Sequence, residues 1–280
     1  MFRLPLLLLI LLFSFIDFSS QAQLRKVVAI GSSTTAGLVT SHPDSAWVRL
    51  FSNYYKNTVG VLDTIINLGV SGTTVYQGMP SSYIPPGGRP APLTANNVTR
   101  AVNLLSDVSP ATNGVIIVNY PSNGYDNYSV NEVLVALQVI YDSATRLGNR
   151  CYISTTQPRS DGNFALPSIR RKQTVLRDSI INRFGVANTL NFFDGMYNPV
   201  DTSALGTYSA GDNVHFNNAG HRVLFERVRD KNIFQLATPA YRSNVNPTGL
   251  WSSAASWETF NGSTWVTASM PPSMGSSAIT

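Results

Sequence analysis

The sequence has few cysteines, few histidines and few long apolar runs. Cys151 is the single cysteine in 280 residues, which excludes an internal disulfide and a cysteine-based metal site. Its apolar neighbours indicate an inert, buried thiol. Beyond the first residues, no segment has the length and apolarity of a membrane-spanning helix, and the basic residues behind the net charge of +5 are scattered. These absences argue against stable membrane insertion and against a nucleic-acid partner.

The N-terminus has the pattern of a targeting signal. Arg3 precedes an apolar run from Pro5 to Ile16, which is too short to span a bilayer as a helix. Small residues at Ser20 and Ala22 fit the spacing that a signal peptidase requires. We therefore expect residues 1–22 to be a signal peptide and the rest of the chain to be secreted or held at the cell surface. An uncleaved membrane anchor is the alternative interpretation.

The next part of the chain alternates between two periodicities. Short β-branched runs predict strands, and apolar residues three and four positions apart predict amphipathic helices. The strands are expected near residues 26–30, 64–68, 114–120, 151–155 and 190–193, and the helices near 47–54, 98–105, 133–147, 169–184 and 221–228. Alternation of this kind predicts a parallel sheet covered on both faces. The expected fold is α/β, a three-layer α/β/α sandwich with a parallel, flavodoxin-like sheet.

The composition changes near residue 237, where Pro, Ser, Asn, Gly and Trp become frequent. Trp251, Trp257 and Trp265 are separated by short polar turns, which indicates the start of a β-rich module. We expect an α/β domain over residues 23–236, and a linker with the beginning of this module over 237–280. Because the pattern breaks off partway, we interpret the module as truncated. The tryptophans fit a carbohydrate-binding surface, although in a β module such residues more often form the core.

Polar and glycine-rich motifs follow the predicted strands. Ligands of a doubly wound sheet bind at the carboxyl ends of its strands, so these positions are candidates for a site. The motifs cover residues 31–37, 67–74 and 119–124, and a further motif at 212–221 precedes the last helix. The connection from Val75 to Leu93 is rich in proline and glycine and is long for a compact domain, a feature often linked to function.

A serine at a strand-to-helix turn is suited to acyl transfer if a histidine can take its proton. Ser33 occupies such a turn. Of the three histidines, His42 falls in a polar loop and His221 on the apolar face of a helix, which leaves His215 as the base. Asp212 can orient the other ring nitrogen of His215 if the backbone between them turns tightly. Asp194, at the end of a strand, is the rival carboxylate.

Together the four motifs resemble the GDSL/SGNH hydrolase family of esterases and lipases over roughly residues 27–231. The resemblance implies that Ser33 is the nucleophile and that Asp212 and His215 complete a catalytic triad. It also implies an oxyanion hole made by the Ser33 and Gly72 N–H groups and the Asn123 side chain. The reaction would need no metal and no organic cofactor.

Two positions depart from the family pattern. Ser32 stands where the family usually has aspartate, and Gly124 where it usually has a second acidic residue. We expect these two positions to change the surroundings of the catalytic residues without abolishing catalysis. Taken without the resemblance, Ser33 has a simpler role as a helix cap, Asn123 as a turn cap and Gly72 as a turn glycine.

The substrate is less constrained than the reaction. Arg159 follows the fourth strand, and its side chain either contacts the substrate or pairs with a surface acid. Predicted export and a tryptophan-bearing tail favour a carbohydrate esterase, most simply an acetylesterase. A lipase or thioesterase of the same family is the alternative. A further alternative is a cell-surface binding or adhesion protein with a degenerate α/β domain, for which Ser32 and Gly124 are the support.

Overall fold

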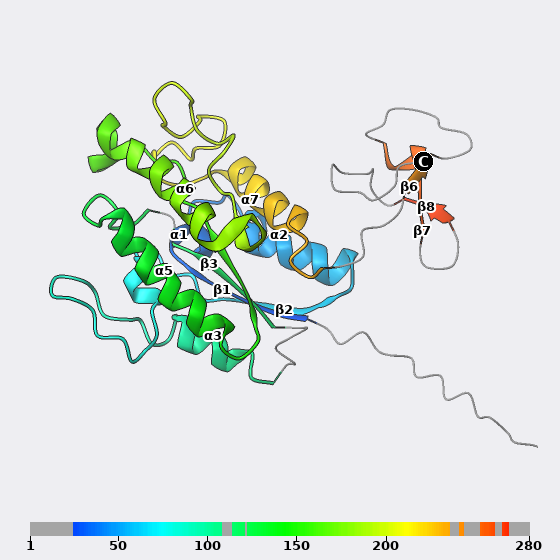
Figure 1. Ribbon diagram of the computed structural model, residues 1–280. Coiled ribbons are helices and arrows are strands. Elements are labelled where there is room, and N and C mark those ends of the chain that lie inside the picture. Colours follow the sequence, from blue (N-terminus) through cyan, green and yellow to red (C-terminus); the bar gives the residue numbers. More distant parts are fainter. Residues whose placement is uncertain are drawn as a thin grey trace, which may run out of the picture.

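The computed structural model describes residues 25–107, 114–120, 122–235, 241–243, 253–260 and 265–268. Its main sheet has five parallel strands in the order β2-β1-β3-β4-β5. Figure 1 shows this sheet between two layers of helices. The strands are β1 Arg25–Gly31, β2 Leu62–Asn67, β3 Gly114–Asn119, β4 Arg150–Ser154 and β5 Thr189–Leu190. This is the flavodoxin-like order, so the fold class expected from the sequence is confirmed.

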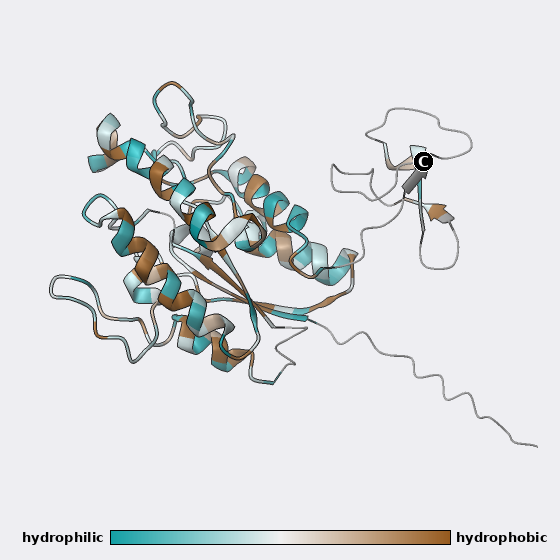
Figure 2. Cartoon of the chain, viewed as in Figure 1, coloured by the Kyte–Doolittle hydropathy of each residue, from teal (hydrophilic) through white to brown (hydrophobic). Residues whose placement is uncertain are grey.

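Helices cover both faces of the sheet. They are α1 Ser33–Ala36, α2 Trp47–Asn53, α3 Val98–Leu104, α5 Val130–Thr145, α6 Pro167–Asn188 and α7 Asn218–Asp230. Val28 and Ile30 of β1 pack in one core cluster with residues of α3, α5 and α6, whereas Val27 and Ala29 pack in another with residues of α2 and α7. Alternate residues of a strand point to opposite faces, which explains the three layers. In Figure 2 the hydrophobic residues, in brown, lie along the strands and in stripes on the helices.

The fifth strand is shorter than predicted. The sequence favoured a strand over residues 190–193, but β5 ends at Leu190. Asn191 then forms a local turn in which its Oδ1 accepts the Phe193 and Asp194 N–H groups, each at 3.0 Å. The Phe192 N–H goes to the side chain of Thr155 rather than to a strand. Side-chain hydrogen bonds of this type compete with the sheet, and propensity alone does not reveal them.

The connection over residues 75–93 is anchored to the domain. It begins with a short 3₁₀ helix, η3 Val75–Gly78, and the Leu93 N–H returns to the Gln77 carbonyl at 2.9 Å. In its middle, Arg89 forms an ion pair with Glu132 of α5, and its guanidinium lies 4.3 Å from the centroid of the Tyr128 ring. These contacts connect the loop to α5 and to its own first turn even though it contains little regular structure.

A small antiparallel sheet follows the α/β domain. It consists of β6 Tyr241–Ser243, β7 Trp257–Phe260 and β8 Trp265–Thr267. Trp257 is buried and packs with Ala268, which is the core role expected for such a tryptophan. The signal peptide predicted at residues 1–22 and the side chains of Trp251 and Trp265 lie outside the part that the structure describes. The domain boundaries therefore stay a prediction.

Cys151 is buried in the core, and burial raises the pKa of its thiol, so it has the character of the inert thiol expected from the sequence. Among the helices of the described residues, none combines the length and apolarity that crossing a bilayer requires.

Glycine at position 31 allows the turn from β1 into α1 to nest against β3. A Cβ atom there would lie 2.3 Å from the Asn119 carbonyl oxygen and 2.3 Å from Thr35 Oγ1. We predict that Gly31→Ala lowers the free energy of unfolding by about 3 kcal/mol, because well-packed cores tolerate added atoms poorly. Chemical denaturation measures this. Gly206→Ala, where nothing lies within 4 Å of the added atom, is the control and should change stability by less than about 0.5 kcal/mol.

Candidate active site

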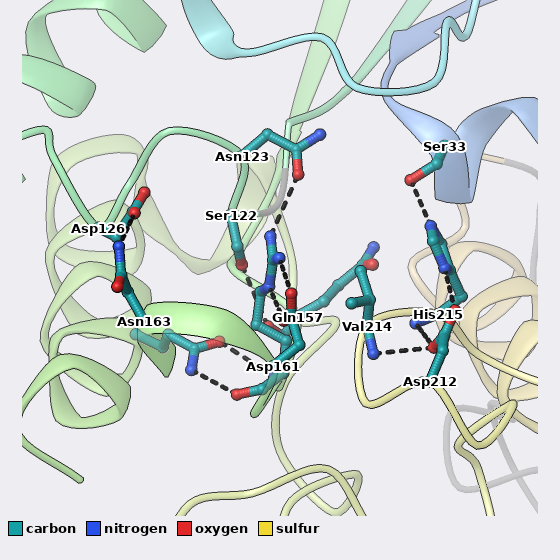
Figure 3. A network of polar contacts seen from close by, with 12 residues as sticks. Ser33, Ser122, Asn123, Asp126, Gln157, Asp161, Asn163, Asp212, Val214 and His215 are labelled. Carbon is teal, nitrogen blue, oxygen red and sulfur yellow. Dashed lines mark hydrogen bonds and ion pairs between the residues drawn. The ribbon is translucent and has the colours of Figure 1, made fainter. Parts of the chain in front are cut away.

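The predicted site residues come from separate segments that meet at the carboxyl edge of the main sheet (Figure 3). Ser33 begins α1 directly after β1, Gly72 follows β2, Asn123 follows β3 and Arg159 follows β4. The segment before α7 contributes His215 together with its carboxylate partner. Parallel strands bring their carboxyl ends to one edge, so residues far apart in sequence become neighbours there.

Three of the predicted side chains form a continuous chain of hydrogen bonds. Ser33 Oγ lies 3.0 Å from His215 Nε2, and His215 Nδ1 lies 2.6 Å from Asp212 Oδ2. Figure 3 shows the three side chains in this order. The Ser33 side chain is largely buried, whereas Asp212 stands nearer to solvent. In this arrangement the imidazole can accept the serine proton while the carboxylate fixes the ring.

The tight turn that the Asp212–His215 spacing requires is present. Asp212 Oδ1 accepts the backbone N–H of Val214 at 2.9 Å and that of His215 at 2.8 Å, and Asn213 has a left-handed backbone with φ of +61°. Asn217 then caps α7 by accepting the Gly220 N–H at 3.1 Å. The side-chain hydrogen bonds of Asp212 and the Asn217 cap together fix the position of His215 next to α7.

The same hydrogen bonds keep Asp212 ionised. Burial alone would raise the pKa of its carboxyl group, but the His215 backbone N–H, the His215 ring and the Val214 N–H together lower that pKa to about 2. A carboxylate that accepts several N–H groups holds its charge well into the acid range. Asp212 is therefore suited to orient the imidazole and to stabilise it when it becomes positively charged.

The other candidates for base and orienting carboxylate are engaged elsewhere. His42 is mostly exposed and accepts the Asp44 N–H, and His221 is fully buried, where burial lowers the pKa of its ring to about 4. The rival carboxylate, Asp194, accepts hydrogen bonds from Arg177 at 2.6 Å and from Asn191 at 2.5 Å.

Potential oxyanion donors lie on the same edge. Ser33 is the first residue of α1. The N–H groups in the first turn of a helix have no partner within the helix, so the Ser33 N–H can donate to another group. Gly72 has φ of +79°, a conformation that favours glycine, and a Cβ atom there would meet nothing within 4 Å. Asn123 donates one Nδ2 hydrogen bond to the Thr73 carbonyl at 3.0 Å, and the amide group retains a second N–H.

The two departures from the family pattern have different surroundings. Ser32 is fully buried, and its Oγ has no hydrogen-bond partner among the described residues. Gly124 has φ of +74°, and a Cβ atom there would lie 2.6 Å from the Tyr128 ring. A side chain at position 124 would therefore be strained by the backbone and would require the Tyr128 ring to move.

A surface pocket of about 450 Å³ adjoins the oxyanion candidates. It is lined by Gly72, Thr74, Asn123, Gly124, Asp126, Arg159, Asp161, Gly162, Asn163 and Phe164. Most of these side chains carry hydrogen-bonding groups, and Phe164 adds an aromatic ring. Asp126, Asp161 and Asn163 were missed by sequence reasoning. The signal that was available is the polar, glycine-containing stretch at 160–163, directly after Arg159.

Sequence reasoning also missed a buried polar network behind Ser33. Thr34 Oγ1 donates to Gln157 Oε1 at 2.8 Å, and Gln157 Nε2 donates to Asn119 Oδ1 at 3.1 Å. Asn119 Nδ2 in turn donates to Thr35 Oγ1 at 3.0 Å. The network ties α1 to the ends of β3 and β4 with uncharged groups. Satisfied networks of this kind fix a single geometry.

A larger cavity, of about 570 Å³, lies away from these groups. It is lined by Ile181, Val186, Thr189, Asn191, Asp194, Arg227, Asp230 and Lys231. None of these residues belongs to the triad, the oxyanion candidates or the buried network. Within the described residues, no group of three or more His, Cys, Asp and Glu side chains is placed to hold a metal ion. We assign the candidate site to the smaller pocket because it adjoins the potential oxyanion donors.

Serine hydrolases use a serine that is hydrogen-bonded to a histidine, which is in turn hydrogen-bonded to an aspartate. Here such a chain lies at the edge of a parallel α/β sheet. The particular family follows from comparison with known proteins. The model of the family described as GDSL-like Lipase/Acylhydrolase matches residues 27–228, so the chain belongs to this family of ester hydrolases. The resemblance found in the sequence motifs is confirmed.

Solved structures show the same fold. A GDSL-like lipase from Bacteroides thetaiotaomicron matches with a TM-score of 0.51 and 17% identity, over 73% of this chain and 86% of that one. TesA matches with a TM-score of 0.50 and 16% identity, over 74% and 97%. A member of the lipolytic G-D-S-L family from Veillonella parvula matches with a TM-score of 0.50 and 14% identity, over 74% of this chain and 97% of that one. Among curated proteins, none matches the chain.

The lowered pKa of Asp212 has a consequence for stability. A carboxyl group titrates at about pH 3.9 in an unfolded chain, so the Asp212 carboxylate stabilises the fold above about pH 4 and loses this effect as pH falls toward 2. We predict that Asp212→Asn lowers the melting temperature at neutral pH and that the difference from the wild type shrinks in acid. Thermal melts between about pH 7 and pH 3 measure this, and a difference independent of pH would contradict the assigned hydrogen bonds.

Proposed function

We propose that the chain is a secreted serine ester hydrolase with a triad of Ser33, His215 and Asp212. The observation that carries the proposal is the unbroken hydrogen-bond chain from Asp212 Oδ2 through the His215 ring to Ser33 Oγ, at the sheet edge that also holds Gly72 and Asn123. Membership of an ester hydrolase family supports the same reaction class.

In the proposed mechanism, Ser33 Oγ attacks the carbonyl carbon of an ester while His215 Nε2 takes the hydroxyl proton. The tetrahedral intermediate collapses, and His215 returns the proton to the leaving alcohol, which leaves an acyl group on Ser33. A water molecule, activated by the same imidazole, then releases the acid. Asp212 stays ionised throughout, because the pKa of its carboxyl group is about 2.

The negative charge of the intermediate would be held by three donors. These are the backbone N–H groups of Ser33 and Gly72 and the remaining N–H of the Asn123 amide. Figure 3 shows the Asn123 amide nitrogen turned toward the Ser33 side of the view. In comparable enzymes, removal of one such donor slows the reaction by roughly 100- to 1000-fold. These roles require no metal and no organic cofactor.

The pocket favours a short acyl group on a hydroxyl-rich alcohol. Its lining offers the Asp126 carboxylate and the Asn163 amide as hydrogen-bonding groups, beside the Asn123 amide. Such a mixture suits the hydroxyl groups of a sugar, whereas a long acyl chain needs an extended apolar wall. We therefore propose a carbohydrate esterase, most simply an acetylesterase, in place of a lipase or a thioesterase.

Export and domain organisation complete the proposal. Removal of residues 1–22 would release a chain that begins at Gln23, with the hydrolase domain over residues 23–236. Residues 237–280 would form a linker and the beginning of a β-rich module, of which β6, β7 and β8 are the described part. An exported enzyme with an appended module is consistent with a polysaccharide ester as substrate.

We predict that Ser33→Ala lowers the rate of p-nitrophenyl acetate hydrolysis by a factor of roughly 10⁴ or more. The protein should be purified from the medium of cells that express the full chain, so that its intact mass also shows whether it begins at Gln23.

Acetyl, butyryl and octanoyl esters should be compared, and the acetyl ester should react fastest. Preference for the octanoyl ester would favour a lipase.

The adjacent residue offers a matched control. Ser32→Ala makes the same chemical change one position earlier, at a hydroxyl with no hydrogen-bond partner among the described residues, and should leave the rate nearly unchanged. Folded protein without serine-dependent turnover of any ester would contradict the enzyme proposal and favour a binding or adhesion protein.

A further inference from the structure

The amide group of Asn123 is held at both of its ends. Its Oδ1 accepts a hydrogen bond from Arg159 Nη1 at 3.2 Å, and its Nδ2 donates to the Thr73 carbonyl at 3.0 Å. Arg159 lies 36 positions further along the chain, in the segment that follows β4. The contact joins the end of β3 to the end of β4 directly beside the proposed oxyanion hole.

These two contacts select one orientation of the amide. A guanidinium group has only donors, so Arg159 can face the oxygen of Asn123 but not its nitrogen. A carbonyl oxygen has only acceptor sites, so Thr73 can face the nitrogen but not the oxygen. A flipped amide would lose both hydrogen bonds, and it would turn an electron-rich oxygen toward the place where the oxyanion develops.

Arg159 is itself held rigidly. Its Nε and Nη2 donate to the two carboxylate oxygens of Asp161, each at 2.6 Å, and its guanidinium carbon lies 4.6 Å from the centroid of the Phe164 ring. The fully buried Gln173 accepts the Arg159 backbone N–H at 3.2 Å and donates to its carbonyl at 3.0 Å. A bidentate ion pair over an aromatic ring leaves the guanidinium little freedom.

Charge adds to the geometric effect. A cationic donor at Oδ1 draws electron density from the amide and makes its N–H groups stronger donors. The position next to Asn123 is Gly124, which has no side chain and whose φ of +74° favours glycine. The charged side chain that contacts Asn123 is that of Arg159, in the segment after β4.

We propose that Arg159 is a positioning residue that fixes and polarises the Asn123 amide as an oxyanion donor. The inference rests on the proposed function, since it assigns Asn123 the donor role. The sequence left two roles open for Arg159, contact with the substrate or pairing with a surface acid. The structure pairs Arg159 with Asp161, and the positioning role differs from substrate contact. A positioning residue acts on kcat through Asn123, whereas a substrate contact of uniform strength acts on KM.

A double-mutant cycle tests this inference with p-nitrophenyl acetate. The full chain is compared with Arg159→Met, Asn123→Ala and the double variant. We expect Asn123→Ala to lower kcat by roughly 100-fold or more, and Arg159→Met by roughly tenfold with KM nearly unchanged. Because Arg159 acts through Asn123, adding Arg159→Met to Asn123→Ala should change kcat no further. Arg159→Lys, which keeps a cationic donor, should recover part of the loss.

Arg177→Met is a matched control for loss of a stacked ion pair. Arg177 also pairs with carboxylates, lies 5.3 Å from the centroid of a phenylalanine ring and has a side chain as buried as that of Arg159, at 16% against 15% exposed. It contacts none of the proposed catalytic groups, so kcat should stay unchanged. Thermal melts of every variant separate loss of fold from loss of rate.

The possible failures are distinguishable. Independent, multiplicative effects of Arg159→Met and Asn123→Ala on kcat would overturn the positioning role, and so would an unchanged kcat in Arg159→Met. A raised KM with unchanged kcat would instead assign Arg159 to substrate binding. If Ser33→Ala retains activity, the proposed function itself fails. If Ser33→Ala is inactive and the cycle is additive, only the role of Arg159 fails.

Discussion

The hydrogen bond between Ser33 and His215 joins two segments that are 182 positions apart in the chain. Everything proposed for this protein depends on that contact, because a serine hydroxyl without a base is a weak nucleophile. The sheet brings the two segments together. Gly31 lets the turn into α1 nest against β3, and the side chain of Asn217 fixes the start of α7 directly after His215. The proposed chemistry thus depends on the core cluster that β1 and α7 share.

Charge is distributed unevenly around Ser33. Behind it, Thr34, Gln157 and Asn119 form a buried network without formal charge. The charged groups stand at the sides, where Asp212 faces the His215 ring and Arg159 pairs with Asp161. A neutral support avoids the cost of burying ions. In the proposed mechanism, the oxyanion donors and the imidazole are then the groups that respond to charge developing on the substrate.

Local patterns predicted the layers of the fold. Ser33, Asp212 and His215 were singled out because each stands in a short motif beside a predicted strand or helix, and the structure brings their side chains together. The end of β5 was not predictable, since the Asn191 turn competes with the sheet through side-chain hydrogen bonds. The contact of Arg159 with Asn123 was also hidden. It joins two segments whose separation in space depends on packing, and neither residue's motif indicates the other.

The most direct test of the central claim is covalent trapping of the nucleophile. The full chain and its His215→Gln variant would be incubated with a p-nitrophenyl phosphonate ester, and the modified peptide identified by mass spectrometry. We predict one adduct, on Ser33, formed rapidly in the wild type and very slowly in the variant, because the imidazole must take the hydroxyl proton. An adduct on another residue, or equal rates in both proteins, would contradict it.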